Sequence, residues 1–183
     1  MFSFTAIDFE TATNYIPCSI GIVVVKDNDI TEVINRFIKP ICFPYFHYYA
    51  QRIHGIHKED VANKPTFDVV WSEISKYFDN TIIIAHNAAF DINVLRKTLN
   101  HYNIPRPVAR YMCTYLLARK TWKNSTKFSL DYLSNQEHIT LNHHHSDSDA
   151  EACAKLFLRE AEILGCSDFK ELKHVAQLRT YKV

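Results

Sequence analysis

Glycine is scarce in this chain, with three residues among 183. Glycine-rich phosphate loops need several glycines within a few positions, because only backbone without a Cβ can wrap closely around a phosphate group. The three glycines are far apart, at Gly21, Gly55 and Gly165. The sequence therefore excludes the common glycine-rich motifs that bind ATP or dinucleotides.

Paired cysteines and long apolar runs are also missing. The five cysteines include no C-x-x-C pair, and an odd number in a chain of this length is not typical of a disulfide scaffold. We therefore expect a reducing compartment, the cytoplasm. No apolar stretch approaches the roughly 20 residues of a membrane-spanning helix, and Asp8 interrupts the N-terminal apolar residues too early for a secretion signal. We expect no association with a membrane.

Charge of one sign is not in excess, because the formal net charge is +1. Any signal for nucleic acid must therefore be local. Apolar residues make up 47% and charged residues 22%, which is ordinary for a globular domain. We expect a single domain over residues 1–183, with a core over about 1–165 and a C-terminal helical extension over 166–183.

Alternating and β-branched apolar residues predict five strands. The strands are expected at residues 2–11, 18–26, 30–38, 81–85 and 110–114. The first three follow one another across a loop at 11–17 and a turn at 27–29, which favours an antiparallel meander. The run at 81–85 is apolar throughout, as expected for a strand buried on both faces.

Apolar residues at helical spacing predict helices between and after the later strands. They are expected at residues 66–78, after the stretch 86–91 through about 101, at 115–120, at 129–136, from 148 onward and at 168–178. Ser148 and Glu151 have the spacing of a capping box, which predicts that the long helix begins at Ser148. Together the elements predict an α/β fold, with one mixed five-stranded sheet flanked by helices.

Two acidic residues lie at the end of the first strand. Because side chains alternate along a strand, Asp8 and Glu10 point to the same side as its first apolar residues. Two carboxylates held together at the edge of a core are unfavourable unless a cation lies between them, and hard divalent cations prefer oxygen ligands. The alternative is that the strand ends at Ile7 and both acids are solvated in a turn.

Two further acids are expected in the first turns of helices. Asp91 lies on the apolar stripe of its helix, where an acid is unusual, although it could simply complement the helix dipole. Asp149 flanks the buried stripe of the long helix. Four converging carboxylates would need positive charge, and two divalent cations about 3.5–4 Å apart would supply it and serve phosphodiester hydrolysis.

Three consecutive histidines precede the last acid, and only His144 lies five residues before Asp149. A neutral imidazole with a pKa near ~6.5 suits a general base that takes a proton from water. His144 is therefore the candidate base. Alternatively, His143, His144 and His145 bind a transition metal, or they are surface residues without a role.

A basic segment covers residues 92–130, which contain no Asp or Glu but eight Lys and Arg. Tyr102, Tyr111, Tyr115 and Trp122 are interleaved with these cations. Cations and aromatic rings together suit a phosphate backbone and unstacked bases. The alternative is an ordinary solvated face.

Three motifs occur in order: Asp8-Phe9-Glu10-Thr11, His86-Asn87-Ala88-Ala89-Phe90-Asp91 and His144-x-x-x-x-Asp149-Ala150. Together they resemble the DnaQ-like 3′–5′ exonucleases of the DEDDh group, of which the proofreading epsilon subunit of bacterial DNA polymerase III is the best-known member. The resemblance runs from about residue 3 to residue 164. It implies a ribonuclease-H-like fold and the removal of nucleoside 5′-monophosphates from a free 3′ end.

The resemblance also implies roles for individual residues. It implies two divalent cations, Mg²⁺ or Mn²⁺, held by the four acids Asp8, Glu10, Asp91 and Asp149, with His144 as the base. It further places four residues near the terminal nucleotide, namely Thr11, Ile53, His54 and Phe90.

The expected substrate is single-stranded or frayed DNA, in proofreading or DNA repair, with a DNA polymerase or repair complex as a candidate partner. An exonuclease of the same fold that trims RNA is one alternative, because contacts to a 2′-hydroxyl cannot be read from sequence. A nucleic-acid-binding subunit that has lost catalysis is another. The chain ends soon after the last motif, which favours a stand-alone enzyme or a small subunit.

Overall fold

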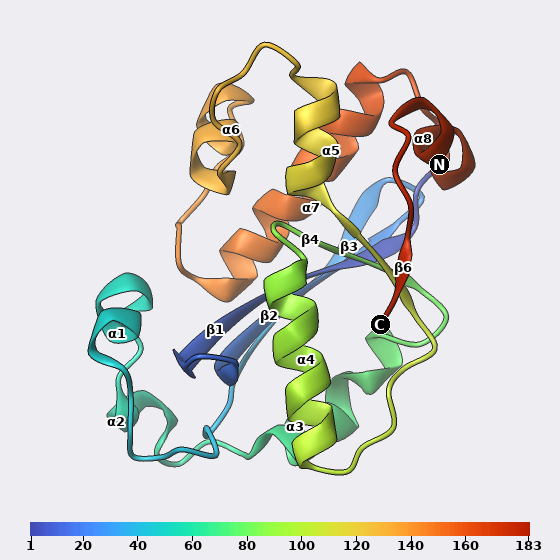
Figure 1. The fold of residues 1–183 in the computed structure, drawn as a ribbon. Helices are drawn as coiled ribbons and strands as arrows, with labels where there is room; N and C mark the ends of the chain where they lie inside the picture. Colours follow the sequence, from blue (N-terminus) through green and yellow to red (C-terminus); the bar gives the residue numbers. More distant parts are fainter.

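Strand β1 (Phe4–Thr13) lies inside a six-stranded sheet of order β3-β2-β1-β4-β5-β6 (Figure 1). The computed structural model describes all residues, 1–183. The other strands are β2 (Ile16–Lys26), β3 (Asp29–Phe37), β4 (Ile82–Ala85), β5 (Arg110–Cys113) and β6 (Tyr181–Lys182). β1, β2 and β3 form an antiparallel meander, β4 and β5 run parallel to β1, and β6 is antiparallel to β5. The predicted α/β fold with a mixed sheet is confirmed.

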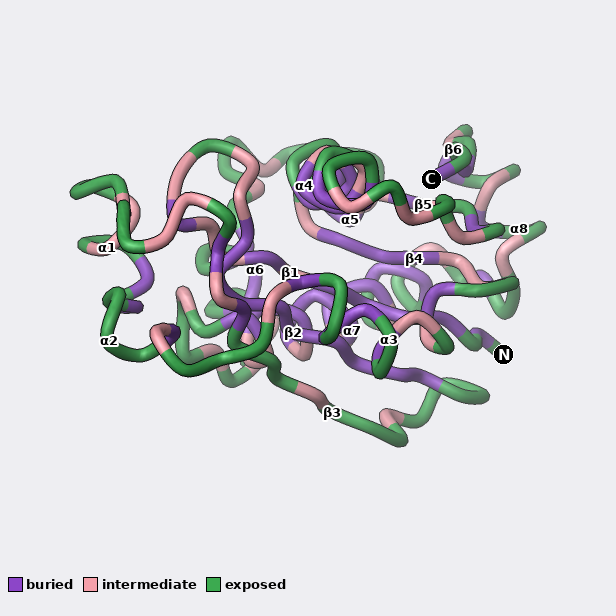
Figure 2. The backbone as a smooth tube through the Cα atoms, turned by 90° about the horizontal axis from the view of Figure 1, so that it is seen from below, coloured by how far each residue is buried: buried purple, intermediate pink, exposed green.

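Helices cover both faces of the sheet. One face packs against α5 (Thr114–Thr121), α6 (Leu130–Gln136), α7 (Ser146–Ile163) and α8 (Phe169–Val175). The other packs against α3 (Phe67–Ile74), the 3₁₀ turn η1 (Ser75–Tyr77) and α4 (Ala89–His101). Figure 2 shows buried segments in the middle of the molecule, between exposed outer surfaces. No helix combines the length and the apolar character needed to cross a lipid bilayer.

The alternation in β1 divides its side chains between two cores. Phe4 and Ala6 belong to the core beneath α7, whereas Ile7 and Phe9 belong to the core beneath α3 and α4. This is the period of two expected for a strand buried on both faces. Asp8 therefore continues the α7 side of the strand, at the point where the strand approaches the edge of the core.

Two predicted boundaries are wrong. Residues 11–17 do not form a loop, because β1 continues to Thr13 and turns tightly at Asn14, whose φ of 46° is in the left-handed region. The long helix begins at Ser146 instead of Ser148. The hydroxyl of Ser148 accepts a hydrogen bond from the Asn142 N–H at 2.8 Å, so it closes the preceding loop and does not cap the helix.

Three short elements were not predicted. β6 adds a sixth strand to the expected five, and its two residues pair with β5 without an apolar run of their own. Helices α1 (Tyr48–His54) and α2 (Lys58–Val61) lie between the strand predicted at 30–38 and the helix predicted at 66–78, where no element was predicted. They are too short to produce a periodic pattern, and they lie beside the C-terminal end of β1 (Figure 1).

Candidate active site

The four predicted carboxylates come from three elements and line one cavity of about 610 Å³. Asp8 and Glu10 come from β1, Asp91 from α4 and Asp149 from α7. The ligand oxygens of Asp8, Glu10 and Asp149 lie within 4.8 Å of one another. His144 lines the same cavity. The structure thus brings together residues from positions 8 to 149 of the chain.

Asp91 is fixed by a hydrogen bond to the central strand. Its Oδ1 accepts the backbone N–H of Phe9 at 3.0 Å, and the residue is only 2% exposed. The side chain therefore points into the core edge between α4 and β1. Asp91 also lies in the first turn of α4, where an acid complements the helix dipole, so that alternative stays compatible with its position.

Only one of the two carboxylate oxygens of Asp149 has a hydrogen-bond partner. Its Oδ2 accepts the backbone N–H of His144 at 2.9 Å, whereas its Oδ1 is buried and has no partner. A buried carboxylate oxygen without a donor costs free energy. A cation bound at this oxygen would remove that cost.

Gly21 allows the first turn of α7 to approach the sheet. It lies opposite Asp8 in the β1–β2 pair, and a Cβ at this position would be 1.9 Å from the carbonyl oxygen of Ser146. The Ser19 and Ser146 hydroxyls are hydrogen-bonded at 2.7 Å across the same interface. The position of Asp149 therefore depends on a glycine in β2. This role of Gly21 was not predicted, although a lone glycine inside a strand is a signal of close backbone approach.

Burial raises the pKa of all four carboxyl groups, and repulsion within the cluster adds to this for Asp8, Glu10 and Asp91. For Asp8 the pKa is raised well above its usual value, first by burial and then by the charge of Asp91. Burial raises the pKa of Glu10 to about 8, with further contributions from Asp149 and Asp91. Burial also raises the pKa of Asp91 to about 7, against the Phe9 hydrogen bond, and that of Asp149 to about 6. Without added positive charge the cluster therefore holds protons near neutral pH.

His144 lies on a backbone turn beside the acids. Its φ of 69° is left-handed, and its half-buried ring stacks on His143 with centroids 3.8 Å apart. Burial and the neighbouring His143 lower its pKa below the usual value, so the ring is neutral near pH 7. A neutral imidazole at a cavity lined by carboxylates has the protonation state that a general base requires.

The four residues predicted near a nucleotide divide into two pairs. Phe90 lines the cavity and is 36% exposed, and Ile53 at the end of α1 is 56% exposed. His54 is buried and both its ring nitrogens are used: Nδ1 accepts from the Ile56 N–H at 3.0 Å, so Nε2–H donates to the Thr11 carbonyl at 3.1 Å. His54 and Thr11 thus join α1 to the end of β1.

His86 is a structural member of the site for which no role was predicted from the sequence. Its Nε2–H donates to the Phe128 carbonyl at 2.9 Å, and its Nδ1 accepts from the Thr114 hydroxyl at 2.8 Å. Burial lowers its pKa to about 4, so it is neutral. The ring ties the end of β4 to α5 and to the loop before α6. Its place at the start of the second motif was the available signal.

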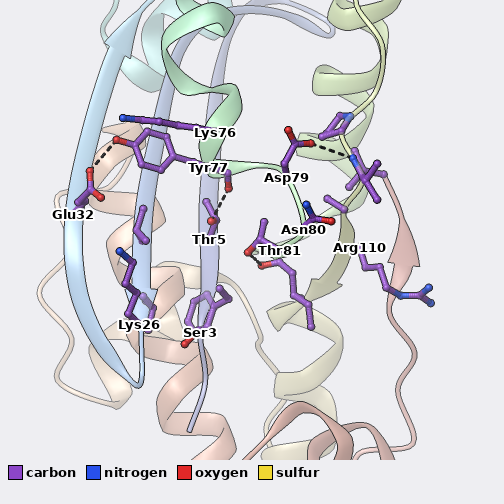
Figure 3. Close-up of a pocket in the computed structure, with 18 of the residues that line it drawn as sticks. Ser3, Thr5, Lys26, Glu32, Lys76, Tyr77, Asp79, Asn80, Thr81 and Arg110 are labelled. Atoms are coloured by element: carbon purple, nitrogen blue, oxygen red, sulfur yellow. Dashed lines mark hydrogen bonds between the residues drawn. The ribbon is translucent and has the colours of Figure 1, made fainter.

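A larger cavity of about 1090 Å³ lies at the opposite end of β1, beside Ser3 and Thr5 (Figure 3). Its two acids already have partners, because Glu32 accepts from the Tyr77 hydroxyl at 2.8 Å and Asp79 from the Val108 N–H at 3.3 Å. No set of converging carboxylates occurs there. The smaller cavity is therefore the candidate active site.

Comparison with known proteins points to the same chemistry. The family model RNase_T, described as an exonuclease, matches residues 5–157. The 3′-5′ exonuclease DinG of Staphylococcus epidermidis is 28% identical over 166 residues, which cover 87% of this chain and 18% of that protein. A PolC-type DNA polymerase III of Clostridium perfringens is 30% identical over 161 residues, covering 84% of this chain and 11% of that protein. The chain thus spans less than a fifth of the length of these two relatives.

Among solved structures, exonuclease X in complex with 5′ overhanging duplex DNA matches with a TM-score of 0.75 and 25% identity. The match covers 94% of this chain and 99% of that chain. The similarity therefore extends over nearly the whole fold, including the elements that carry the four acids.

Proposed function

The chain belongs to the RNase_T exonuclease family, and on this premise we propose that it is a metal-dependent 3′–5′ exonuclease that releases nucleoside 5′-monophosphates from DNA. The observation that carries the proposal is the convergence of Asp8, Glu10, Asp91 and Asp149 on one cavity with a neutral histidine. The 3′–5′ direction is supported by the name of the DinG relative, and DNA by the ligand of exonuclease X.

The donor set fits hard divalent cations such as Mg²⁺ or Mn²⁺. All the oxygen ligands are carboxylates, three of them lie within 4.8 Å, and the buried Oδ1 of Asp149 has no other partner. Asp8, Glu10, Asp91 and Asp149 would hold two cations. When bound, the cations would polarise the scissile phosphate and stabilise the charges that develop on the attacking and leaving oxygens.

The residues of the chain would contribute proton transfer and alignment. His144 would accept the proton of the attacking water at its imidazole nitrogen, because the ring is neutral near pH 7. Its backbone N–H holds Asp149, so the base and one cation ligand are positioned by the same turn. The Phe9 N–H holds Asp91 in the same way. Such fixed geometry contributes to catalysis by reducing reorganisation during the reaction.

Nucleic acid would enter across exposed aromatic and basic residues. We expect the terminal base to pack against Phe90, beside Ile53, with Thr11 and His54 holding α1 in place. Tyr115, at the start of α5, also lines the cavity. From there exposed cations continue along α5 and the following loop, at Arg119, Lys120, Lys123 and Lys127. These cations would follow the phosphates of a single strand.

The setting of the activity is also a proposal. The PolC-type relative supports a function with a DNA polymerase or in repair. The five cysteines are free, which supports a reducing cytoplasm. Residues 1–183 would act as one exonuclease domain, because the 166–183 extension packs Phe169 against Phe2 and pairs β6 with the sheet.

The test uses a 5′-labelled single strand, Mg²⁺ and the purified protein. We expect stepwise shortening from the 3′ end with release of nucleoside 5′-monophosphates, and no shortening with EDTA. Matched DNA and RNA strands are compared at equal concentration, and DNA is expected to be degraded faster. Faster RNA degradation would replace DNA as the substrate, and no degradation of either strand would overturn the proposed activity.

A further inference from the structure

His143 has no role in the proposed reaction, but its ring lies beside His144 and Asp149, which both have one. The ligand atoms of His143, His144 and Asp149 lie within 4.8 Å of one another, in a group separate from that of Asp8, Glu10 and Asp149. His145, the third consecutive histidine, is not part of either group. The two groups share only Asp149.

The backbone holds the two imidazoles on one side of the turn. Side chains of adjacent residues normally diverge, but the left-handed φ of His144, 69°, lets its ring stack on that of His143 with an interplanar angle of 17°. The loop is closed by the hydrogen bond from the Asn142 N–H to the Ser148 hydroxyl. A second bond, from the His144 N–H to Asp149 Oδ2, fixes the turn against α7.

The donor chemistry of this group differs from that of the acidic cluster. Imidazole nitrogen suits borderline transition metals, whereas Mg²⁺ and Mn²⁺ prefer oxygen. Two imidazoles and one carboxylate are a recurrent ligand set for Zn²⁺, with water in the fourth position. The Oδ1 of Asp149, a residue only 4% exposed, is buried and has no hydrogen-bond partner, so one ligand oxygen is available without the loss of a bond.

We propose that His143, His144 and Asp149 form an inhibitory site for Zn²⁺ at the rim of the candidate active site. Tetrahedral ligands at about 2.0–2.1 Å from zinc lie about 3.4 Å apart, so the exposed His143 ring and the half-buried His144 ring would rotate to complete the site. Bound Zn²⁺ would occupy the imidazole that acts as base and the carboxylate shared with the acidic cluster. This consequence for activity rests on the proposed function, but the binding of zinc does not.

The first test measures zinc binding without nucleic acid, by competition with a chromogenic zinc chelator in saturating Mg²⁺. We expect His143→Ala to weaken Zn²⁺ binding at least about tenfold. His145→Ala is the matched control, because this neighbouring side chain makes no capping hydrogen bond and lies outside the group. Equal zinc affinity in the wild type and His143→Ala would overturn the proposal, as would an equal loss in His145→Ala.

The second test separates zinc binding from the nuclease reaction. In Mg²⁺, the nuclease rate of the His143→Ala variant, relative to its own rate without zinc, is expected to resist inhibition by Zn²⁺, whereas the wild type and His145→Ala are inhibited. Asp8→Asn is expected to lose the nuclease activity and to keep the Zn²⁺ affinity, because Asp8 is not a member of the histidine group. Zinc affinity lost in Asp8→Asn would overturn the separate site. Zinc bound as expected by a protein that degrades no strand would overturn the proposed function alone.

Discussion

Helix α7 carries two buried acids, of which one lines a cavity with other carboxylates and the other lies alone in the core. Asp149 and Glu160 are eleven positions apart, about three helical turns, so both lie on the side of the helix that faces the protein. Asp149 reaches a cavity that it shares with three other carboxylates and His144. Glu160 is 0% exposed, and neither of its carboxylate oxygens has a hydrogen-bond partner.

The comparison shows that a raised pKa does not by itself identify an active site. Burial raises the pKa of Asp149 to about 6 and that of Glu160 well above its usual value. Asp149 lines a cavity together with Asp8, Glu10 and Asp91. At Glu160 the only cause of the raised pKa besides burial is the neighbouring Cys113. A cation can reach the first acid, and only a proton can neutralise the second. Cation binding therefore depends on the convergence of several acids and on their access to a cavity.

The largest effect is expected at the acidic cluster, from Asp8→Asn. Removing one negative ligand should lower the rate of DNA shortening in Mg²⁺ at least about a thousandfold. The same change should raise the melting temperature in EDTA, because the repulsion from Asp91 and Glu10 falls. Product release and thermal unfolding are measured on the same preparation. Retained activity, or a lower melting temperature in EDTA, would contradict the assignment of Asp8.

Gly21→Ala is expected to act on Asp149 through the position of α7. The new Cβ would collide with the Ser146 carbonyl and displace the turn that holds Asp149. We expect about a hundredfold loss of activity and a loss of about 1–3 kcal/mol of unfolding free energy. Gly165→Ala is the matched control: it strains a φ of +66° without a new contact, at the other end of α7. If both variants kept full activity, the close approach of α7 to β2 would not matter for catalysis.

The stability of the metal-free protein should fall as pH rises. Glu10, Asp91 and Asp149 have folded-state pKa values of about 8, 7 and 6, above those of an unfolded chain. The folded state therefore binds more protons, and the stability present below about pH 4 is lost progressively up to about pH 8. In EDTA we expect the melting temperature to drop by about 4 °C or more between pH 5 and pH 8. Mg²⁺ should reduce this drop, and a flat profile in EDTA would contradict the raised pKa values of the three acids.

The smallest effect on nuclease activity is expected at Glu160, the second buried acid of α7. Glu160→Met removes two unpartnered oxygens from the core and keeps a side chain of similar length. We expect an increase of about 1–2 kcal/mol in unfolding free energy and no change in nuclease rate. Chemical unfolding and the strand-shortening assay are the measurements. An equal loss of activity in Glu160→Met and Asp8→Asn would remove the distinction between the two acids.

Local patterns predicted much of the fold. The alternation of Phe4, Ala6 and Asp8 placed β1 and the direction of its acids, because the period of two follows from strand geometry. The helical spacing of apolar residues likewise placed Asp91 on the buried stripe of α4. The predicted loop at residues 11–17 was wrong, because the left-handed Asn14 makes a tight turn and both β1 and β2 extend into this range. The predicted start of α7 was also wrong, because contact with Gly21 and Ser19 matters more than the Ser148–Glu151 spacing.

The sequence alone determined the identities of the four acids and His144, and their order in three motifs, because ligand chemistry is set by residue type. Only the tertiary structure decided that Asp149 Oδ1 has no partner, that His54 is engaged by Thr11, and that His143 stacks on His144. The bond between His54 and Thr11 joins segments that are distant along the chain, whereas the histidine stack follows from the left-handed backbone of His144. A linear pattern records spacing along the backbone, whereas such contacts arise from how sheet and helices pack.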